Sequence, residues 1–151
     1  MVEILQFQLH GQKYGIPASD ADEILRAVSI TSLPNAPHII EGAVNIRGAV
    51  TPVLDIRRRF GIPAKPVEPS DYLIVARAGS RRVVIRADQV RGLVGLSAAD
   101  IADVTSVTAK IDHISGVAKL PDGLVLLHDL HTFLSQAENE ALDASLGRPA
   151  P

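Results

Sequence analysis

The sequence predicts an all-β fold, in which two small β-barrels related by internal duplication are followed by a C-terminal helix. The first observation is a repeat, because residues 38–56 and residues 112–130 run in register. The second is that glycine and proline turns separate short apolar segments throughout, which is typical of small barrels. The third is that only the C-terminal segment has the apolar spacing of a helix. Two similar halves favour docking of a protein partner over a catalytic pocket.

The repeat is defined by matching glycine, apolar and aspartate positions. The matched pairs include Ile40 and Ile114, Gly42 and Gly116, Val50 and Leu124, Val53 and Leu127, and Asp55 and Asp129. A weaker match further upstream relates Gly11 to Gly79 and Asp20 to Asp88. Two copies of one β unit are therefore expected.

The beginning of the chain has the pattern of a hairpin followed by an extended run. Residues 3–10 alternate between apolar and polar side chains, and a turn at Gly11 leads into a second strand. Pro17 ends that strand because proline has no ladder donor. Residues 23–30 resume as an extended run, and residues 31–37 are expected to form a loop because they contain prolines and an asparagine.

The next segments predict a second hairpin and a connector. Residues 44–46 and 49–54 are apolar strands, and Gly48 between them allows the positive φ that a tight turn requires. Residues 56–60 read as a short helical turn. Residues 65–69 form the clearest connector, since they present no apolar face to bury.

The second half repeats this order and then changes period. Its predicted segments are a hairpin (72–78 and 82–86), a strand (89–96), a helix start (97–100) and a last hairpin (115–120 and 124–127). Residues 101–111 are ambiguous. From residue 129 to residue 146 the apolar positions recur every three or four residues, which indicates one face of an amphipathic helix. That face consists of Leu130, Phe133, Leu134, Ala137, Ala141 and Leu142.

The whole chain of 151 residues is expected to form one domain. We place the first lobe at about residues 12–64 and the second at about residues 71–128. The N-terminal strand and the helix at 129–146 are expected to pack against these lobes. A chain of this length buries roughly 68–70% of its unfolded surface, so no metal or disulfide is needed to hold it.

Composition excludes several classes of function. The chain has no cysteine, which excludes disulfides, thiol nucleophiles and thiolate metal sites. Both halves carry as many basic as acidic side chains, and aromatic residues are few, so a nucleic-acid partner is not expected. The run at residues 57–59 is basic, but we expect it to be the solvated end of a short helix rather than a polyanion site. No stretch resembles a leader or a membrane span, which predicts a cytoplasmic protein without membrane insertion.

Two patterns resemble catalytic or metal sites, and neither is complete. His128 and His131 lie three residues apart, with His113 further upstream, but a metal site needs a third ligand of fixed geometry. The matched Asp55 and Asp129 lack the loop sequences of an aspartic-protease dyad, so we expect each to cap the helix that follows it. No nucleotide-binding loop or nucleophile elbow is present. The sequence therefore predicts no catalytic residue, no metal, no cofactor and no enzymatic activity.

Residues 42–57, GAVNIRGAVTPVLDIR, resemble the signature of the CheW family, the bacterial chemotaxis coupling proteins. The resemblance extends to Phe7 in the first hairpin, to Glu23, and to the segment from Leu124 to Leu130. It covers essentially the whole chain. Ala21 departs from the family pattern, which prefers a branched apolar residue there.

The resemblance implies two five-stranded SH3-like barrels with a hydrophobic core between them, in a single CheW-like domain. It also implies a non-enzymatic adaptor or scaffold for chemotaxis signal transduction. Such proteins bridge the cytoplasmic tip of methyl-accepting chemoreceptors to the regulatory domain of a CheA-type histidine kinase, and are recruited to receptor arrays. In the family the receptor hairpin lies in a groove between the lobes.

Three residues match partner-binding positions of the family: Arg47, Glu23 and Gly42. Arg47 lies in a tight turn with no carboxylate at a helical spacing, so we expect its guanidinium to be available to a partner. Glu23 reads equally well as a solvated strand edge. Gly42 recurs as Gly116, which indicates a backbone requirement in both lobes and an indirect effect on binding.

Other functions remain open from the residues alone. An adaptor could serve a chemosensory pathway other than motility, such as biofilm or pilus control. A small-ligand-binding or hydrolytic double barrel would need a deep pocket with convergent polar groups. An RNA-associated SH3-like protein would need a basic face.

Overall fold

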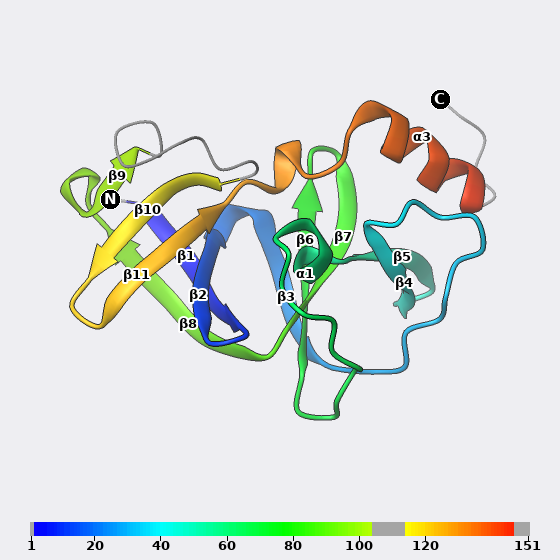
Figure 1. Ribbon diagram of the computed structural model, residues 1–151, viewed down its shortest axis with the longest axis horizontal. Helices are drawn as coiled ribbons and strands as arrows, with labels where there is room; N and C mark the ends of the chain where they lie inside the picture. The colour runs from blue at the N-terminus through cyan, green and yellow to red at the C-terminus, as the bar shows by residue number, and fades with distance from the viewer. Residues whose placement is uncertain (1, 104–113, 147–151) are drawn as a thin grey trace.

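A computed structural model of the protein describes residues 2–103 and 114–146, and it contains two sheets that lie side by side (Figure 1). The six-stranded sheet has the order β8 (Gln89–Leu96), β1 (Val2–Leu9), β2 (Gln12–Pro17), β11 (Gly123–His128), β10 (Ile114–Leu120) and β9 (Ile101–Asp103). The five-stranded sheet has the order β3 (Ala21–Arg26), β6 (Tyr72–Ala78), β7 (Arg81–Ala87), β5 (Ala49–Leu54) and β4 (Ile40–Ile46). We call these two parts the six-stranded half and the five-stranded half.

The two sheets have the same internal plan, which confirms the duplication in the fold. The order β8-β1-β2-β11-β10 corresponds strand by strand to β3-β6-β7-β5-β4. Each sheet contains two hairpins that meet through one parallel strand pair, β2 with β11 in the six-stranded sheet and β7 with β5 in the five-stranded sheet. The other pairings are antiparallel.

The predicted lobe boundaries need correction, because each sheet draws strands from both copies of the repeat. Strand β2, assigned to the lobe at 12–64, belongs to the six-stranded sheet. Strands β6 and β7, assigned to the lobe at 71–128, belong to the five-stranded sheet. The strand that follows each hairpin crosses over and pairs with the hairpin of the other copy, β3 with β6 and β8 with β1. The sequence repeat does not reveal this exchange. The two copies have similar hairpins, so the strand that follows each hairpin could pair with either of them.

Three apolar clusters form the core. One lies within the five-stranded half (Val44, Ile46, Val53, Leu73, Val75 and Val84), and one lies within the six-stranded half (Ile4, Leu96, Ala118 and Val125). The largest joins the halves and includes Phe7, Leu9, Tyr14, Ile16, Leu54, Ile74, Ile85 and Phe133. Successive residues of β6 and β7 alternate between the cluster within the five-stranded half and the cluster that joins the halves, so these strands are buried on both faces. The hydrophobic core expected between the two lobes is confirmed.

The C-terminal helix is shorter than predicted. Helix α3 spans Gln136–Ser145, and a separate 3-10 turn, η3, spans Leu130–Thr132. Ser135 begins α3 with a capping box, in which its hydroxyl accepts from the N–H of Glu138 and its own N–H donates to the Glu138 carboxylate. Leu142 is buried, but Ala137 and Ala141 are exposed, so the apolar face of six residues does not belong to one helix. No helix among the described residues is both long and apolar enough to span a membrane.

Two of the short helices follow aspartate caps. The Asp55 carboxylate accepts from the N–H of Arg58 at the start of α1 (Ile56–Arg59), and that of Asp129 accepts from the N–H of His131 in η3, as predicted. Two further 3-10 turns are η1 (Ala18–Asp20) and η2 (Ala98–Asp100), the second at the predicted helix start. The ambiguous segment 101–111 is a strand, β9, to residue 103, and its remainder lies outside the described residues.

The expectation of a solvated basic run at 57–59 is wrong for two of its three arginines. Arg57 is buried and donates to the Asp88 carboxylate, with Nη2 2.7 Å from each oxygen. Arg59 donates to Glu138 across 3.0 Å. Only Arg58 is exposed. Both paired arginines meet carboxylates from distant parts of the chain, which local charge patterning does not reveal.

Candidate partner-binding surface

The β4–β5 hairpin presents Arg47 at the tip of a two-residue turn. Arg47 has φ 50° and Gly48 has φ 85°, a pair of positive values typical of a type I′ hairpin turn. The Asn45 side-chain oxygen accepts from the N–H of Gly48 at 2.7 Å and so holds the turn. The positive φ predicted for Gly48 is confirmed. That Arg47 also adopts one was not anticipated, because such a conformation is uncommon for arginine.

Arg47 and Glu23 form an ion pair across the five-stranded half. Nη2 of Arg47 donates to Oε1 of Glu23 at 2.9 Å, and Nη1 contacts Oε2. Glu23 lies on β3 and Arg47 follows β4, and these strands are the two edges of the sheet. The guanidinium therefore has a carboxylate partner within the chain, which the lack of a carboxylate at a helical spacing did not indicate. Its availability to a binding partner stays a prediction. Glu23 lies far along the chain from Arg47, and only the curvature of the sheet brings the two together.

Gly42 allows the two sheet edges to meet. Thr31 and Ala43 exchange backbone hydrogen bonds of 3.0 and 2.8 Å, which joins the segment after β3 to β4. A Cβ on Gly42 would lie 2.5 Å from the Thr31 carbonyl oxygen and 2.6 Å from Cγ2 of Ile30. The backbone requirement inferred for Gly42 is thus explained by this close approach. The backbone N–H and C=O of Ala43 both bond to Thr31, and so they point away from Pro52, the residue opposite Ala43 on β5. Pro52 has no N–H to donate, and its lack of one therefore costs no hydrogen bond to β4 at this position.

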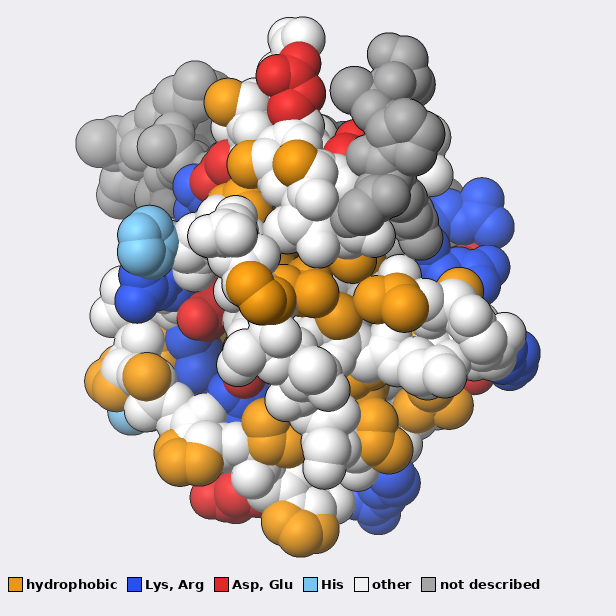
Figure 2. Space-filling model, turned by 90° about the vertical axis from the view of Figure 1, so that its right-hand side faces the viewer, with side chains coloured by type: hydrophobic (Ala, Val, Ile, Leu, Met, Phe, Trp, Pro, Cys, Tyr) orange, Lys and Arg blue, Asp and Glu red, His pale blue; other side chains and the backbone are white. Residues whose placement is uncertain are grey.

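An open apolar hollow of about 540 Å³ adjoins this contact. Its lining residues are Val28, Ser29, Thr31, Leu33, Ala43, Val44, Asn45 and Val50. A second hollow of about 380 Å³ shares Val28 and Ser29 with it and extends to Val67, Glu68 and Pro69. We call the two together the valine groove, because Val28, Val50 and Val67 are its exposed apolar side chains. Figure 2 shows hydrophobic side chains spread over this end of the molecule, with most charged side chains towards the margins.

The chemistry of the valine groove suits docking rather than catalysis. Glu68 is the one ionisable side chain among its lining residues. General acid–base or nucleophilic chemistry needs paired groups within hydrogen-bond reach. Exposed apolar side chains beside an ion pair have instead the composition of a protein interface, with an apolar centre and a polar rim.

The two histidines considered as metal ligands have separate surroundings. His128 is buried, with its ring 5.1 Å from the Phe60 ring and 5.5 Å from the Phe133 ring. His131 accepts a hydrogen bond at Nδ1 from the N–H of Gly79, and its Nε2 lies 3.2 Å from Asp20. Within residues 2–103 and 114–146, no three potential ligand side chains gather to hold a metal ion. His113 lies outside these residues.

Sequence reasoning found Arg47, Glu23 and Gly42, and the structure brings all three to the five-stranded half. It missed the valine groove and the role of Asn45. A sequence signal existed for Asn45, since asparagine before a glycine turn often bonds to the turn backbone. No local signal marks Val28, because its exposure depends on where the segment after β3 leaves the sheet. The placement of a receptor hairpin between the lobes stays a prediction.

Comparisons with known proteins identify the family. The family model described as the CheW-like domain matches residues 3–138. The chemotaxis protein CheW of Klebsiella aerogenes is 30% identical over 143 residues, which cover 93% of this chain and 86% of that protein. The protein FrzA of Myxococcus xanthus is 33% identical over 118 residues, covering 78% and 74% of the two chains.

A solved structure shows the same fold. The crystal structure of the scaffolding protein TtCheW from Thermoanaerobacter tengcongensis superposes with a TM-score of 0.81 at 28% identity, covering 91% of this chain and 94% of that one. The two-sheet architecture, the duplication and the family match agree with one another. This chain belongs to the CheW-like family of chemotaxis proteins.

Proposed function

We propose that this protein is a non-enzymatic adaptor that couples the cytoplasmic tip of chemoreceptors to the regulatory domain of a CheA-type histidine kinase. It acts in the cytoplasm, at receptor arrays, without a cofactor. The observation that carries the proposal is the valine groove: exposed apolar side chains gather beside the Arg47–Glu23 ion pair. Family membership supplies the partners, and the groove supplies a surface suited to a protein.

The three site residues have different roles in this proposal. Arg47 is well exposed, with 71% of its side-chain surface accessible, so a partner can reach it. Glu23 orients the guanidinium of Arg47 and leaves donors of that guanidinium for a partner's carboxylates or carbonyls. Gly42 touches no partner and acts through Thr31, which lines the valine groove.

Titration against both partners tests the proposal. The purified protein is titrated by calorimetry with the kinase regulatory domain and, separately, with a receptor cytoplasmic fragment. We expect saturable binding to each, and kinase activity that responds to receptor only when the protein is present. Arg58→Ala, which removes an exposed arginine of α1, is a matched control for Arg47→Ala. Binding to neither partner would refute the adaptor role.

The coupling role applies equally to a chemosensory pathway with an output other than motility. Capture of partners from native cells, followed by identification of the kinase and receptors, distinguishes these outputs. A small-ligand-binding barrel is the competing function. The hollows of the valine groove are open at the surface and carry few convergent polar groups, which disfavours it.

A further inference from the structure

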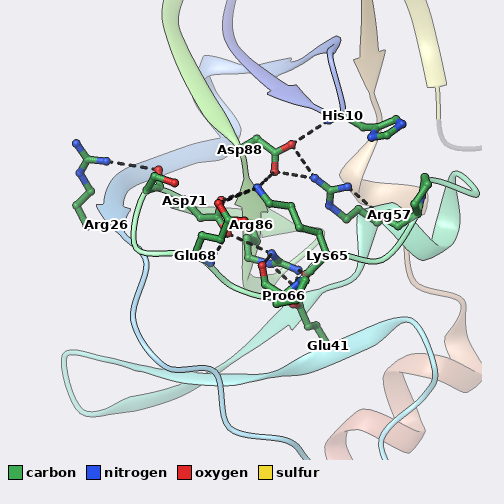
Figure 3. Close-up of polar contacts among 12 residues, drawn as sticks. His10, Arg26, Glu41, Arg57, Lys65, Pro66, Glu68, Asp71, Arg86 and Asp88 are labelled. Atoms are coloured by element: carbon green, nitrogen blue, oxygen red, sulfur yellow. Dashed lines mark hydrogen bonds and ion pairs between the residues drawn. The ribbon is translucent and has the colours of Figure 1, made fainter.

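A polar cluster lies where the chain passes from one half to the other (Figure 3). Asp88 is the residue between β7 of the five-stranded half and β8 of the six-stranded half. Its backbone N–H donates to the carbonyl of Gln8 at 3.0 Å. Its carboxylate accepts from the N–H of His10 at 2.9 Å, in the turn between β1 and β2. Asp88 is therefore bound to the six-stranded half through backbone groups.

The same carboxylate is bound to the five-stranded half by a buried arginine. Nη2 of Arg57, in α1, lies 2.7 Å from both oxygens of Asp88, and Nη1 donates to the carbonyl of Pro63 at 3.0 Å. Nζ of Lys65 lies 3.4 Å from Asp88. One carboxylate thus meets the β1–β2 turn, α1 and the segment that joins β5 to β6.

Arg86 binds that segment from the other side. Its guanidinium donates to the carbonyls of Lys65 at 2.6 Å and Pro66 at 3.2 Å, to Asp71 at 3.2 Å and to Glu41. Asp71 is completely buried and accepts in addition from the N–H of Glu68 at 2.9 Å. The segment 62–71, which we call the connector, is therefore fixed by its backbone although it buries little apolar surface.

The apolar core between the halves determines their relative orientation less strictly than the polar contacts at Asp88 do. Apolar attraction is non-directional and tolerates sliding of one packed face over another. Charge-assisted hydrogen bonds to a planar carboxylate depend on direction as well as distance. Leu9 and Ala87, which belong to the core between the halves, directly precede His10 and Asp88. A change of orientation would therefore strain the bonds at Asp88 first.

We propose that the Asp88 carboxylate fixes the two halves and the connector in one relative orientation, and that losing its charge lets the halves reorient while their separate cores persist. This device is independent of which partner binds. Its functional consequence rests on the proposed adaptor role: a partner that contacts both halves gains affinity from their fixed orientation, because no ordering is required on binding.

Hydrogen exchange and residual dipolar couplings on the full chain test the proposal. The variants are Asp88→Asn and Arg57→Lys, and the second keeps the buried positive charge but loses the two-oxygen contact. The matched control is Asp122→Asn, because Asp122 pairs with Lys13 at 2.5 Å within the six-stranded half alone. We expect both junction variants to exchange at least tenfold faster at the His10 amide and across residues 63–71, and the dipolar couplings to report a changed angle between the sheets. The control should show neither change.

Three outcomes would overturn the proposal. These are an unchanged angle between the sheets in a folded junction variant, faster exchange confined to His10 with the connector unaffected, and equal effects in the Asp122→Asn control. If Asp88→Asn fails to fold, Arg57→Lys carries the same comparison. Because these readouts use no partner, a failure of the adaptor role would appear only in the titrations, where neither partner would bind the unmodified protein.

Discussion

The guanidinium carbon of Arg59 lies 4.8 Å from the centroid of the Phe133 ring, in a cation–π contact between α1 and the segment before α3. The same guanidinium donates to the carbonyl of Phe133 at 2.8 Å and to the Glu138 carboxylate. A second arginine, Arg81 of β7, reaches Asn139 and Asp143 on α3. Helix α3 is therefore attached to the five-stranded half largely by arginines, with Leu142 as its buried apolar side chain.

Replacing Arg59 by alanine is expected to loosen α3 and to lower the free energy of unfolding by about 1–3 kcal/mol, since one cation–π contact and charge-assisted hydrogen bonds are lost. Chemical denaturation measures the loss, and limited proteolysis locates it. Arg58→Ala, an exposed neighbour on α1, should change stability little. Equal stability of the Arg59 variant and the unmodified protein would show that α3 does not depend on this contact.

Removing residues 134–151 is expected to destabilise the fold by about 2–5 kcal/mol, because Leu134 and Leu142 are buried in the core between the halves. Thermal unfolding of the truncated chain measures this effect. A shorter truncation after residue 146 retains α3 and serves as the control. An unchanged melting temperature after the longer truncation would mean that α3 contributes nothing to the fold.

Gly42→Ala is expected to destabilise the protein by about 1–3 kcal/mol, because its Cβ must displace the backbone of Thr31. Gly61→Ala is the control, since Gly61 has φ 69° but has open space around it. That control should cost about 1 kcal/mol through its backbone conformation alone. If the Gly42 variant also binds the kinase domain less well, the loss of affinity should vanish when binding is corrected for the folded fraction of the variant, which denaturant unfolding measures.

Arg47→Ala is expected to leave folding nearly intact, because exposed ion pairs contribute only about 0–1 kcal/mol. It should weaken receptor coupling by about 1.5–3 kcal/mol, the usual cost of a charge-assisted hydrogen bond lost from an interface, and should affect the kinase domain less. Combining it with Glu23→Ala tests whether the two act as a pair, in which case the double variant binds no more weakly than Arg47→Ala. Equal losses for both partners, or a collapse of the melting temperature, would identify Arg47 as a structural residue.

Acid should weaken the junction at Asp88. Burial alone would raise the pKa of its carboxyl, but the His10 N–H, Arg57 and Lys65 outweigh burial and hold that pKa below its ordinary value. Its contribution to stability is therefore present above the unfolded-state pKa and is lost as pH falls through the lower, folded-state pKa. Denaturant unfolding at several pH values measures this. The stability difference between the unmodified protein and Asp88→Asn should shrink below about pH 4, and a constant difference would contradict the ionised junction.

The hairpins could be predicted from the sequence because alternation and turn residues are local signals. The residues assigned to the first hairpin, to residues 72–86 and to residues 89–96 agree with β1–β2, β6–β7 and β8. The helix at 129–146 was predicted too long, because a three-to-four spacing continued across Ser135, where a capping box starts a new helix. The pairing of hairpins between the two copies depends on tertiary packing, and no local sequence pattern encodes it.

The candidate site, too, could be predicted from the sequence only in part. The glycine requirement at Gly42 could be inferred because both copies carry it, and the contact with Thr31 explains it. The ion pair of Arg47 with Glu23 could not be inferred, since the two residues lie on opposite edges of the sheet. The roles of Arg57 and Asp88 were missed for the same reason: each finds its partner only after the two halves have come together.

The exchange of strands between the copies has a consequence for the chain as a folding unit. A cut between Ala64 and Lys65 would leave fragments that each supply strands to both sheets: β1 to β5 on one side, and β6 to β11 on the other. Neither fragment contains all the strands of either sheet, so each should be unstructured alone and the two should regain the fold on mixing. The chain therefore cannot be divided between its two repeats into autonomous modules, and its two sheets are expected to form and to unfold together.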